Sequence, residues 1–195
     1  MIGDHGSDDS AVPNLEIRIK LALKLALTLH KLHFTSWLHK SIRPDNILFL
    51  DGPSTNPDLT KPTLVGFEYS RPNEPTQHSD CARIRNRRHD VYKHPECQGE
   101  ISERFKPVYD MYSLGVVLTE IGFWKPAEKL AKMEENDYAE ITRKKLLEKA
   151  KSELAGKMGS KYLEAVTRCL NVDSNKGNEE LMEQVILQLM HLEGF

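Results

Sequence analysis

The most regular pattern of apolar and polar positions lies between residues 15 and 32, after the helix-start signal Pro13-Asn14. Apolar side chains fall at every second position from Leu15 to Leu29, an alternation typical of a β-strand. The segment is much longer than an ordinary strand of about five or six residues, and its leucine, alanine and lysine residues favour helices. Spacings of three and four also indicate a helical stripe, formed by Leu15, Ile19, Ala22, Ala26 and Leu29. We therefore predict a mostly buried helix here.

Two short apolar runs, Ile47–Leu50 and Thr63–Val65, follow this helix and are separated by Asp51-Gly52 and a loop rich in Pro, Asn and Ser. This arrangement predicts a small β-hairpin with a long tip. Residues 68–107 are polar and lack periodicity, so we expect mostly loop there. From Tyr109 onward the pattern is helical, with one apolar face made by Leu114, Val117, Leu118 and Ile121. Further helices are predicted near 127–134, 138–155, 159–170 and 179–192, separated by Gly156, Gly159 and a turn at 173–178.

The composition is that of a globular protein. The 195 residues include 27 Lys and Arg against 29 Asp and Glu, a net charge of −2, which argues against a polybasic nucleic-acid binder. Cys81, Cys97 and Cys169 are widely spaced, as in proteins of a reducing compartment. No secretory signal opens the chain, and the apolar stretch Leu21–Leu29 contains Lys24 and is too short to span a membrane. These features predict a cytoplasmic protein with no membrane span and no nucleic-acid partner.

Three spaced motifs resemble those of protein kinases. The run from Leu38 to Leu48 (LHKSIRPDNIL) is similar to the catalytic loop H-R-D-L-K-P-x-N-I-L, and Leu64–Glu68 (LVGFE) falls where D-F-G would stand. His94-Pro95-Glu96 is similar to A-P-E, and Asp110–Gly115 (DMYSLG) to the D-x-W-S-x-G helix. Their order, spacing and predicted secondary structure together make the resemblance specific.

The resemblance implies a mainly α fold, the helical C-terminal lobe of a protein kinase with a small β-hairpin, over residues 14–195. Residues 1–13 are then expected to be a flexible lead-in. No G-x-G-x-x-G loop followed by V-A-I-K is present, so the N-terminal lobe is expected to be absent. More narrowly, the chain resembles degenerate kinase-like domains of filamentous fungi, some of which follow a helical HeLo-type domain.

The resemblance places the catalytic residues of the family on a degenerate loop. The position of the catalytic carboxylate holds Ser41, which cannot accept a proton at neutral pH, and that of the metal-binding aspartate holds Gly66. The resemblance implies two positions that bind Mg²⁺ through side-chain oxygen atoms. Gly66 has no side chain, so only Asn46 is retained of these two ligands. Arg43 replaces a phosphate-contacting lysine, and Lys40 replaces an arginine that receives activation-loop phosphates.

Other family positions are retained for structure. His39, Phe67 and Asp110 match residues that hold the lobe together, and Gly115 and Glu96 match structural positions. Glu96 ordinarily pairs with an arginine near the last helices, a position at which this chain offers Lys176 as its nearest cation. The pairing is therefore expected to be weakened or rerouted.

Two acids could in principle replace the missing metal ligand. Glu68 stands two residues after Gly66 and would point to the same side of an extended segment, while the alternative is a solvated loop residue. Asp45 is either such a substitute or a local cap. The favoured reading of both is the structural one.

The loop predicted between residues 68 and 107 offers two further candidate sites. A basic run beside Ser70, Thr76, Ser79 and Tyr92 could bind phosphate or simply be solvated; it comprises Arg83, Arg85, Arg87 and Arg88. His89, His94 and Cys97 have loose metal-like spacing, for which a structural role is the favoured reading, and no metal site is expected.

The expected function is that of a pseudokinase, an interaction or regulatory module with a protein partner. The alternative is a fragment of an active protein kinase that transfers phosphate from ATP to Ser or Thr with unconventional metal ligation. No cofactor is expected for this chain alone, and ATP and Mg²⁺ are expected only if an N-terminal lobe is supplied. That lobe, or a helical signalling domain, could precede this segment in a longer parent protein.

Overall fold

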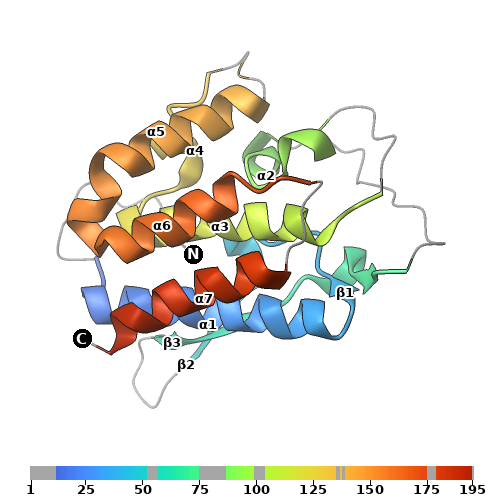
Figure 1. Cartoon of the computed structure of the whole chain (residues 1–195), viewed down its shortest axis with the longest axis horizontal. Helices are drawn as coiled ribbons and strands as arrows, with labels where there is room; N and C mark the ends of the chain where they lie inside the picture. Colours follow the sequence, from blue (N-terminus) through green and yellow to red (C-terminus); the bar gives the residue numbers. More distant parts are fainter. Residues whose placement is uncertain are drawn as a thin grey trace.

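The structure, a computed structural model, describes residues 12–51, 57–74, 87–98, 104–134, 137, 139–174 and 179–194. The described chain is mainly helical, with two small two-stranded sheets (Figure 1). The first half contains one long helix and the short strands, which are α1 (Leu15–Phe34), β1 (Trp37–Leu38), β2 (Ile47–Asp51), β3 (Pro57–Leu64) and β4 (Arg71–Pro72). The second half is helical, with α2 (Arg87–Asp90), α3 (Pro107–Phe123), α4 (Ala127–Leu130), α5 (Ala139–Met158), α6 (Ser160–Leu170) and α7 (Glu179–Glu193). Short 3₁₀ turns lie at η2 (Pro44–Asn46), η3 (Phe67–Tyr69) and η4 (Pro95–Cys97).

Helix α1 confirms the prediction made from its length and composition. The Asn14 side chain caps its first turn by accepting a hydrogen bond from the Ile17 N–H at 2.9 Å. The buried stripe is unusually wide because β3, α3 and α7 all pack against α1, and it comprises Ile19, Leu21, Ala22, Leu23, Leu25, Ala26 and Leu29. This packing on several sides explains why apolar residues recur more often than a one-sided helix needs.

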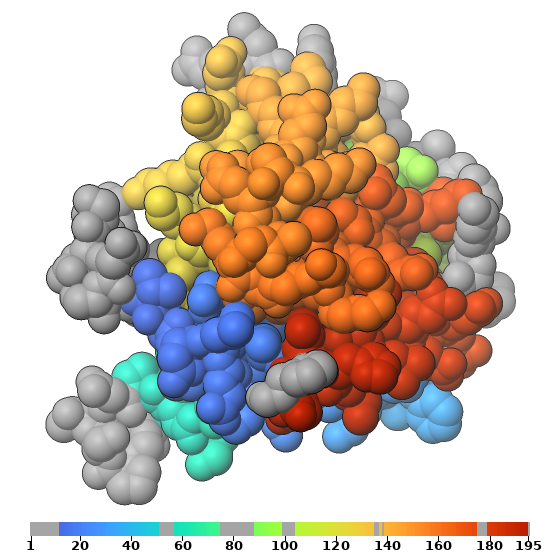
Figure 2. Space-filling model, turned by 60° about the vertical axis from the view of Figure 1, so that its left-hand side comes forward, coloured from blue at the N-terminus to red at the C-terminus, as the bar shows by residue number. Residues whose placement is uncertain are grey.

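Helix α3 forms the centre of the molecule. It packs against α1, α4, α5 and α6, and every residue from Val108 to Phe123 is buried. Figure 1 shows α5 above α3, α6 overlapping α3 in this view, and α7 and α1 below it. In the space-filling view of Figure 2, α5 covers the centre of the face, with α7 and the start of α1 beneath it.

The predicted hairpin is confirmed as the antiparallel pair β2–β3, in which Ile47 lies opposite Leu64. Ile47 is buried and Phe49 packs against the core, whereas Leu48 and Leu50 on the other face of β2 are 47% and 68% exposed. The second pair, β1–β4, joins Trp37 to Pro72 and was not predicted.

The helices predicted after Tyr109 are present, but α4 ends at Leu130 instead of near residue 134, and the boundary predicted at Gly156 is wrong. Gly156 does not separate two helices: α5 continues through it to Met158, and the break falls at Gly159, whose φ is +86°. A glycine on an open helix surface costs only about 1 kcal/mol relative to alanine, so the packing of α5 against α6 is sufficient to continue the helix. No helix within the described ranges is long and apolar enough to cross a membrane.

Candidate functional site

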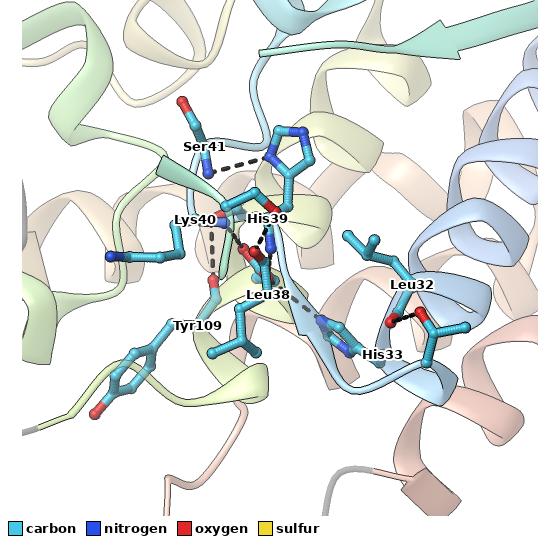
Figure 3. Close-up of polar contacts among 11 residues, drawn as sticks. Leu32, His33, Leu38, His39, Lys40, Ser41 and Tyr109 are labelled. Atoms are coloured by element: carbon cyan, nitrogen blue, oxygen red, sulfur yellow. Dashed lines mark hydrogen bonds and ion pairs between the residues drawn. The ribbon is translucent and has the colours of Figure 1, made fainter. Parts of the chain in front are cut away.

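The loop between β1 and β2 is held by a buried carboxylate on the first turn of α3. Asp110 is fully buried and accepts hydrogen bonds from the N–H groups of His39 at 2.8 Å and Lys40 at 2.7 Å (Figure 3). The Nε2 atom of His33, at the end of α1, lies 3.3 Å from the same carboxylate. Hydrogen bonds to an ionised acceptor are about twice as strong as neutral ones, so Asp110 anchors this loop to two helices.

The anchored loop has a strained backbone at Lys40. Its φ of +68° lies in the left-handed region, which costs a residue with a Cβ about 1–2 kcal/mol. The hydrogen bond from the Lys40 N–H to the Asp110 carboxylate helps to hold the backbone in this conformation. The Lys40 Nζ atom lies 5.6 Å from the centre of the Phe105 ring, a cation–π contact.

His39 links the loop to the segment that follows β3. Its Nε2 atom donates to the Val65 carbonyl at 3.0 Å, and its Nδ1 atom accepts from the Ser41 N–H at 3.3 Å. Its ring contacts Phe67 edge-on, with the ring centroids 4.7 Å apart. Burial lowers the pKa of His39, which keeps the imidazole neutral and fits the tautomer that these two bonds require. Both nitrogens are therefore engaged in structure.

Ser41 is the acceptor in a local network. Its Oγ atom accepts from Arg43 Nη1 at 2.7 Å and from Asn46 Nδ2 at 3.0 Å. Asn46 Nδ2 also donates to the Ser41 carbonyl at 2.7 Å. A hydroxyl oxygen has two acceptor positions, and both are used here. This arrangement fixes Arg43 and Asn46 but supplies no group that could take a proton from a substrate hydroxyl.

Gly66 lies directly against Asn46. Its φ is +83°, and a Cβ at this position would lie 2.3 Å from Asn46 Cγ. Magnesium prefers charged oxygen ligands in octahedral geometry, but the donors gathered here are the neutral hydroxyl of Ser41 and the neutral amide of Asn46. Within the described residues, no group of three or more His, Cys, Asp or Glu side chains could hold a metal ion. These side chains therefore do not fit a Mg²⁺ site.

The two candidate substitute carboxylates lie elsewhere. The extended geometry expected for Glu68 is wrong, because residues 67–69 form the 3₁₀ turn η3, where Glu68 is exposed. The Asp45 side chain is 68% exposed, with its Oδ2 atom 3.5 Å from Arg43 Nε and 3.6 Å from His89 Nε2. Asp45 therefore has the character of a surface acid beside two basic side chains.

Glu96 has neutral partners. It accepts hydrogen bonds from the Tyr109 hydroxyl at 2.9 Å and the Ser174 hydroxyl at 3.2 Å. Burial acts to raise the pKa of Glu96, but these two hydrogen bonds, together with the charges of His94 and Lys106, outweigh it and hold that pKa below its usual value. Lys176, the cation expected to pair with it, lies outside the described residues.

Gly115 and His94 are packing residues. A Cβ at Gly115 would lie 2.6 Å from Cys169 Cβ, so the glycine permits the close approach of α3 and α6. The His94 ring stacks on Tyr109 with the centroids 4.9 Å apart, and its Nδ1 atom accepts from the Glu96 N–H. Of the basic run, Arg83 and Arg85 lie outside the described residues, as do Thr76 and Ser79.

The sequence analysis missed a second buried carboxyl group, Glu120 in α3. Its Oε1 atom accepts from the Tyr92 hydroxyl at 2.7 Å and from the Ala127 N–H at 2.6 Å, while Oε2 is buried with no hydrogen-bond partner within the described part of the chain. Burial raises the pKa of Glu120 to about 7. The signal in the sequence was an acid in the last turn of a largely apolar helix.

Comparison with known families gives one match. Residues 4–190 match the family described as a domain of unknown function, DUF7580, and the chain therefore belongs to that family. No curated protein matches the sequence.

Proposed function

We propose that this DUF7580 protein has the C-terminal lobe architecture of a protein kinase, has lost phosphoryl transfer, and acts as an interaction or regulatory module. The proposal of kinase ancestry rests on the order of the motifs and is supported by how the corresponding residues meet. The Asp110 carboxylate holds the amides of His39 and Lys40, and His39 contacts Phe67. Asp110, His39 and Phe67 are the residues that the resemblance assigns to holding the lobe together.

The proposed loss of catalysis is supported by the arrangement of Ser41, Asn46 and Gly66. Phosphoryl transfer depends on a carboxylate that orients the attacking hydroxyl and on Mg²⁺ that neutralises the phosphates. Here the first position is a hydroxyl whose acceptor sites are filled by Arg43 and Asn46. At the second, the Asn46 amide occupies the volume that a side chain at position 66 would need.

An interaction role is supported by exposed apolar side chains on the hairpin. Leu48 and Leu50 share the outer face of β2, and Phe67 in η3 is 48% exposed. Leu48 and Leu50 are neighbours on one face of a strand, and adjacent exposed apolar side chains are typical of surfaces that another protein covers. We propose a protein partner, such as an upstream lobe or domain of a longer parent protein.

A radiolabelled phosphotransfer assay with Mg²⁺ and Mn²⁺ tests the proposal. We expect no incorporation above background for the wild type, for Asn46→Ala, or for the distant surface variant Gly156→Ala. Transfer by the wild type and Gly156→Ala that is lost in Asn46→Ala would overturn the proposal in favour of an active kinase fragment with unconventional metal ligation.

Thermal unfolding with ATP and Mg²⁺ tests nucleotide binding separately. A ligand that binds only the folded state raises the Tm by an amount that grows with the logarithm of its concentration relative to its Kd. We expect no rise for this chain alone. A metal-dependent rise of several degrees that Asn46→Ala removes would show that this loop binds nucleotide.

A further inference from the structure

Residues 87–98, which contain α2 and η4, are held on α3 by a buried carboxyl group. Tyr92, which lies between α2 and η4, donates its hydroxyl hydrogen to Glu120 Oε1 at 2.7 Å. Glu120 lies in the last turn of α3 and is only 1% exposed. The same Oε1 atom accepts from the Ala127 N–H at 2.6 Å, at the start of α4. One carboxyl oxygen therefore joins three segments of the chain.

The second oxygen atom of this carboxyl group, Oε2, is buried and has no hydrogen-bond partner within the described part of the chain. The charged side chains with the largest effect on the group are Asp45 of η2 and Glu128 of α4, and both are negative. Burial and these charges favour the neutral acid, and they raise the pKa of Glu120 to about 7. The group therefore changes its charge close to neutral pH.

Side chains from the other helices that pack on α3 bond to other groups. Arg18 of α1, Tyr162 of α6 and Lys149 of α5 all contact the C-terminal half of α3. The arginine and the tyrosine each donate to a backbone carbonyl of α3 at 2.9 Å, and the lysine ammonium lies over the Phe123 ring. None of these three contacts is made to the Glu120 carboxyl group.

Residues 87–98 are the part of this junction that can open most easily. Helix α4 packs against both α3 and α5, whereas α2 is a single turn of four residues. Several polar bonds of the segment are internal, such as those from Gln98 Nε2 to the carbonyls of Asp90 and Lys93. These bonds persist if the segment moves as a unit, while the contact of Tyr92 with Glu120 is lost. Small units of this kind open locally at a lower free energy than the whole molecule.

We propose that Glu120 is a pH-dependent latch that holds residues 87–98 on α3. The neutral carboxyl group accepts from Tyr92 and keeps the segment closed. Ionisation places a charge at a buried site with one oxygen atom unsatisfied, and opening of the segment relieves this by admitting water to the carboxylate. Opening therefore becomes more frequent as the pH rises through about 7, although the buried Val91 and His94 keep the closed form the major one.

Such opening would change the surface beside the loop that follows β1. A cavity of about 30 Å³ lies between this loop and the segment, and its lining includes Lys40, Ser41 and Arg43 from the loop and His89, Tyr92 and Lys93 from the segment. When the segment opens, these side chains become more accessible to a partner. The inference goes beyond the proposed function and does not depend on the outcome of the phosphotransfer assay.

Hydrogen exchange of the full chain at pH 6 and pH 8, followed by mass spectrometry, tests the latch. After correction for the intrinsic pH dependence of exchange, protection of peptides covering residues 87–98 should fall about tenfold from pH 6 to pH 8. This value follows from a Glu120 pKa of about 7 in the closed form and of 4.5 in the opened form. The same peptides should be less protected than those of α6 at both pH values, because they open without global unfolding.

Three variants isolate the contribution of the carboxyl group. Glu120→Gln keeps an acceptor for Tyr92 and the Ala127 N–H but does not ionise, so protection of residues 87–98 should be equal at the two pH values. Glu148→Gln, at an exposed position of α5, should retain the fall of about tenfold. Tyr92→Phe removes the donor and should lower the protection of the segment at both pH values.

The latch is wrong if wild-type protection of the segment is the same at pH 6 and pH 8, or if Glu120→Gln still shows the full decrease. It is also wrong if residues 87–98 are protected as strongly as α6, since they would then open only with the whole molecule. Unchanged protection of the segment in Tyr92→Phe would overturn the proposal as well, which keeps the test decisive even if Glu120→Gln fails to fold.

Discussion

At the scale of single residues, the Asn46 side chain occupies the space that a side chain at position 66 would need. The glycine has a left-handed φ of +83°, and its missing side chain would collide with the asparagine amide. A side chain introduced at position 66 therefore requires Asn46 to move, so replacing Gly66 alone would not place a carboxylate here without a local rearrangement.

We expect Gly66→Asp to lower the free energy of unfolding by about 2 kcal/mol or more, because it adds backbone strain and overpacking. Urea denaturation followed by circular dichroism measures this change. The double variant Asn46→Ala/Gly66→Asp should be less destabilised than the sum of the single variants, since the clash is removed. Strict additivity would contradict the contact.

Glu120 predicts a pH dependence of stability. Its pKa is about 7 in the folded protein, above its model-compound value of 4.5, because it is buried with Asp45 and Glu128 as additional negative charges. A raised folded-state pKa means that its contribution is fully present below about pH 4.5. It declines as the pH rises and is lost once the pH has passed the folded pKa of about 7. The total effect is about 3 kcal/mol.

Glu120→Gln should therefore flatten the stability profile between about pH 5 and pH 8 relative to the wild type, because glutamine does not ionise. Its amide oxygen can still accept from Tyr92 and the Ala127 N–H. Urea midpoints across this pH range provide the measurement, with the exposed Glu148→Gln as the control. Parallel profiles for wild type and Glu120→Gln would show that Glu120 ionises normally.

At the scale of elements, the close contact of α3 with α6 depends on Gly115. A Cβ there would lie 2.6 Å from Cys169 Cβ and 3.1 Å from the backbone of α6, atoms that no rotamer change can move. Alanine gains about 1 kcal/mol over glycine in helix propensity, but overpacking a core costs about 1–3 kcal/mol.

We expect Gly115→Ala to be net destabilising by about 1–2 kcal/mol, and Gly156→Ala to stabilise by up to about 1 kcal/mol. Both glycines lie inside helices, but a Cβ at Gly156 would have no atom within 4 Å. Thermal unfolding of the two variants compares packing with propensity directly. A stabilising Gly115→Ala would mean that α6 shifts to accommodate the methyl group.

The elements themselves were largely predictable, because their signals are local. Asn14 marks the start of α1, and the run Ile47–Leu50 marks β2. The pair β1–β4 was missed because each strand has only two residues and is defined by a partner more than thirty positions away. The geometry of Glu68 was wrong because a 3₁₀ turn of three residues has no periodicity to detect.

The residues of the candidate site could be predicted from the sequence, but the contacts between them could not. The motifs named Ser41, Asn46 and Gly66, but not the amide that fills the position 66 volume. The contact between His33 and Asp110 is a tertiary one, because these two residues are separated by 77 positions in the chain. Such contacts depend on how helices pack, which the sequence of either helix alone does not specify.

At the scale of the whole molecule, Asp110 joins segments that are far apart in the chain. Its carboxylate contacts the end of α1 and the loop after β1 from the first turn of the central helix. Asparagine at this position has nearly the same shape, but its NH₂ group would face one of the N–H groups that now donate to the carboxylate.

We expect Asp110→Asn to increase hydrogen exchange of the His39 and Lys40 amides by about ten- to a hundredfold, as loss of a charged acceptor implies. The same change at the exposed Asp45 should leave their exchange nearly unchanged. Exchange followed by mass spectrometry on peptides covering residues 35–42 measures the effect. Equal exchange in both variants would contradict the anchoring role of Asp110.

The inward orientation of Tyr92 has a consequence for enzymes that modify proteins. Its hydroxyl donates to the buried Glu120, and burial raises the pKa of the phenol well above its usual value. A tyrosine kinase can therefore reach this oxygen only when the segment around it opens, and a phosphate added there could not return to its place beside Glu120. Modification at Tyr92 would trap the opened form, so its rate under native conditions would report how often this part of the protein opens.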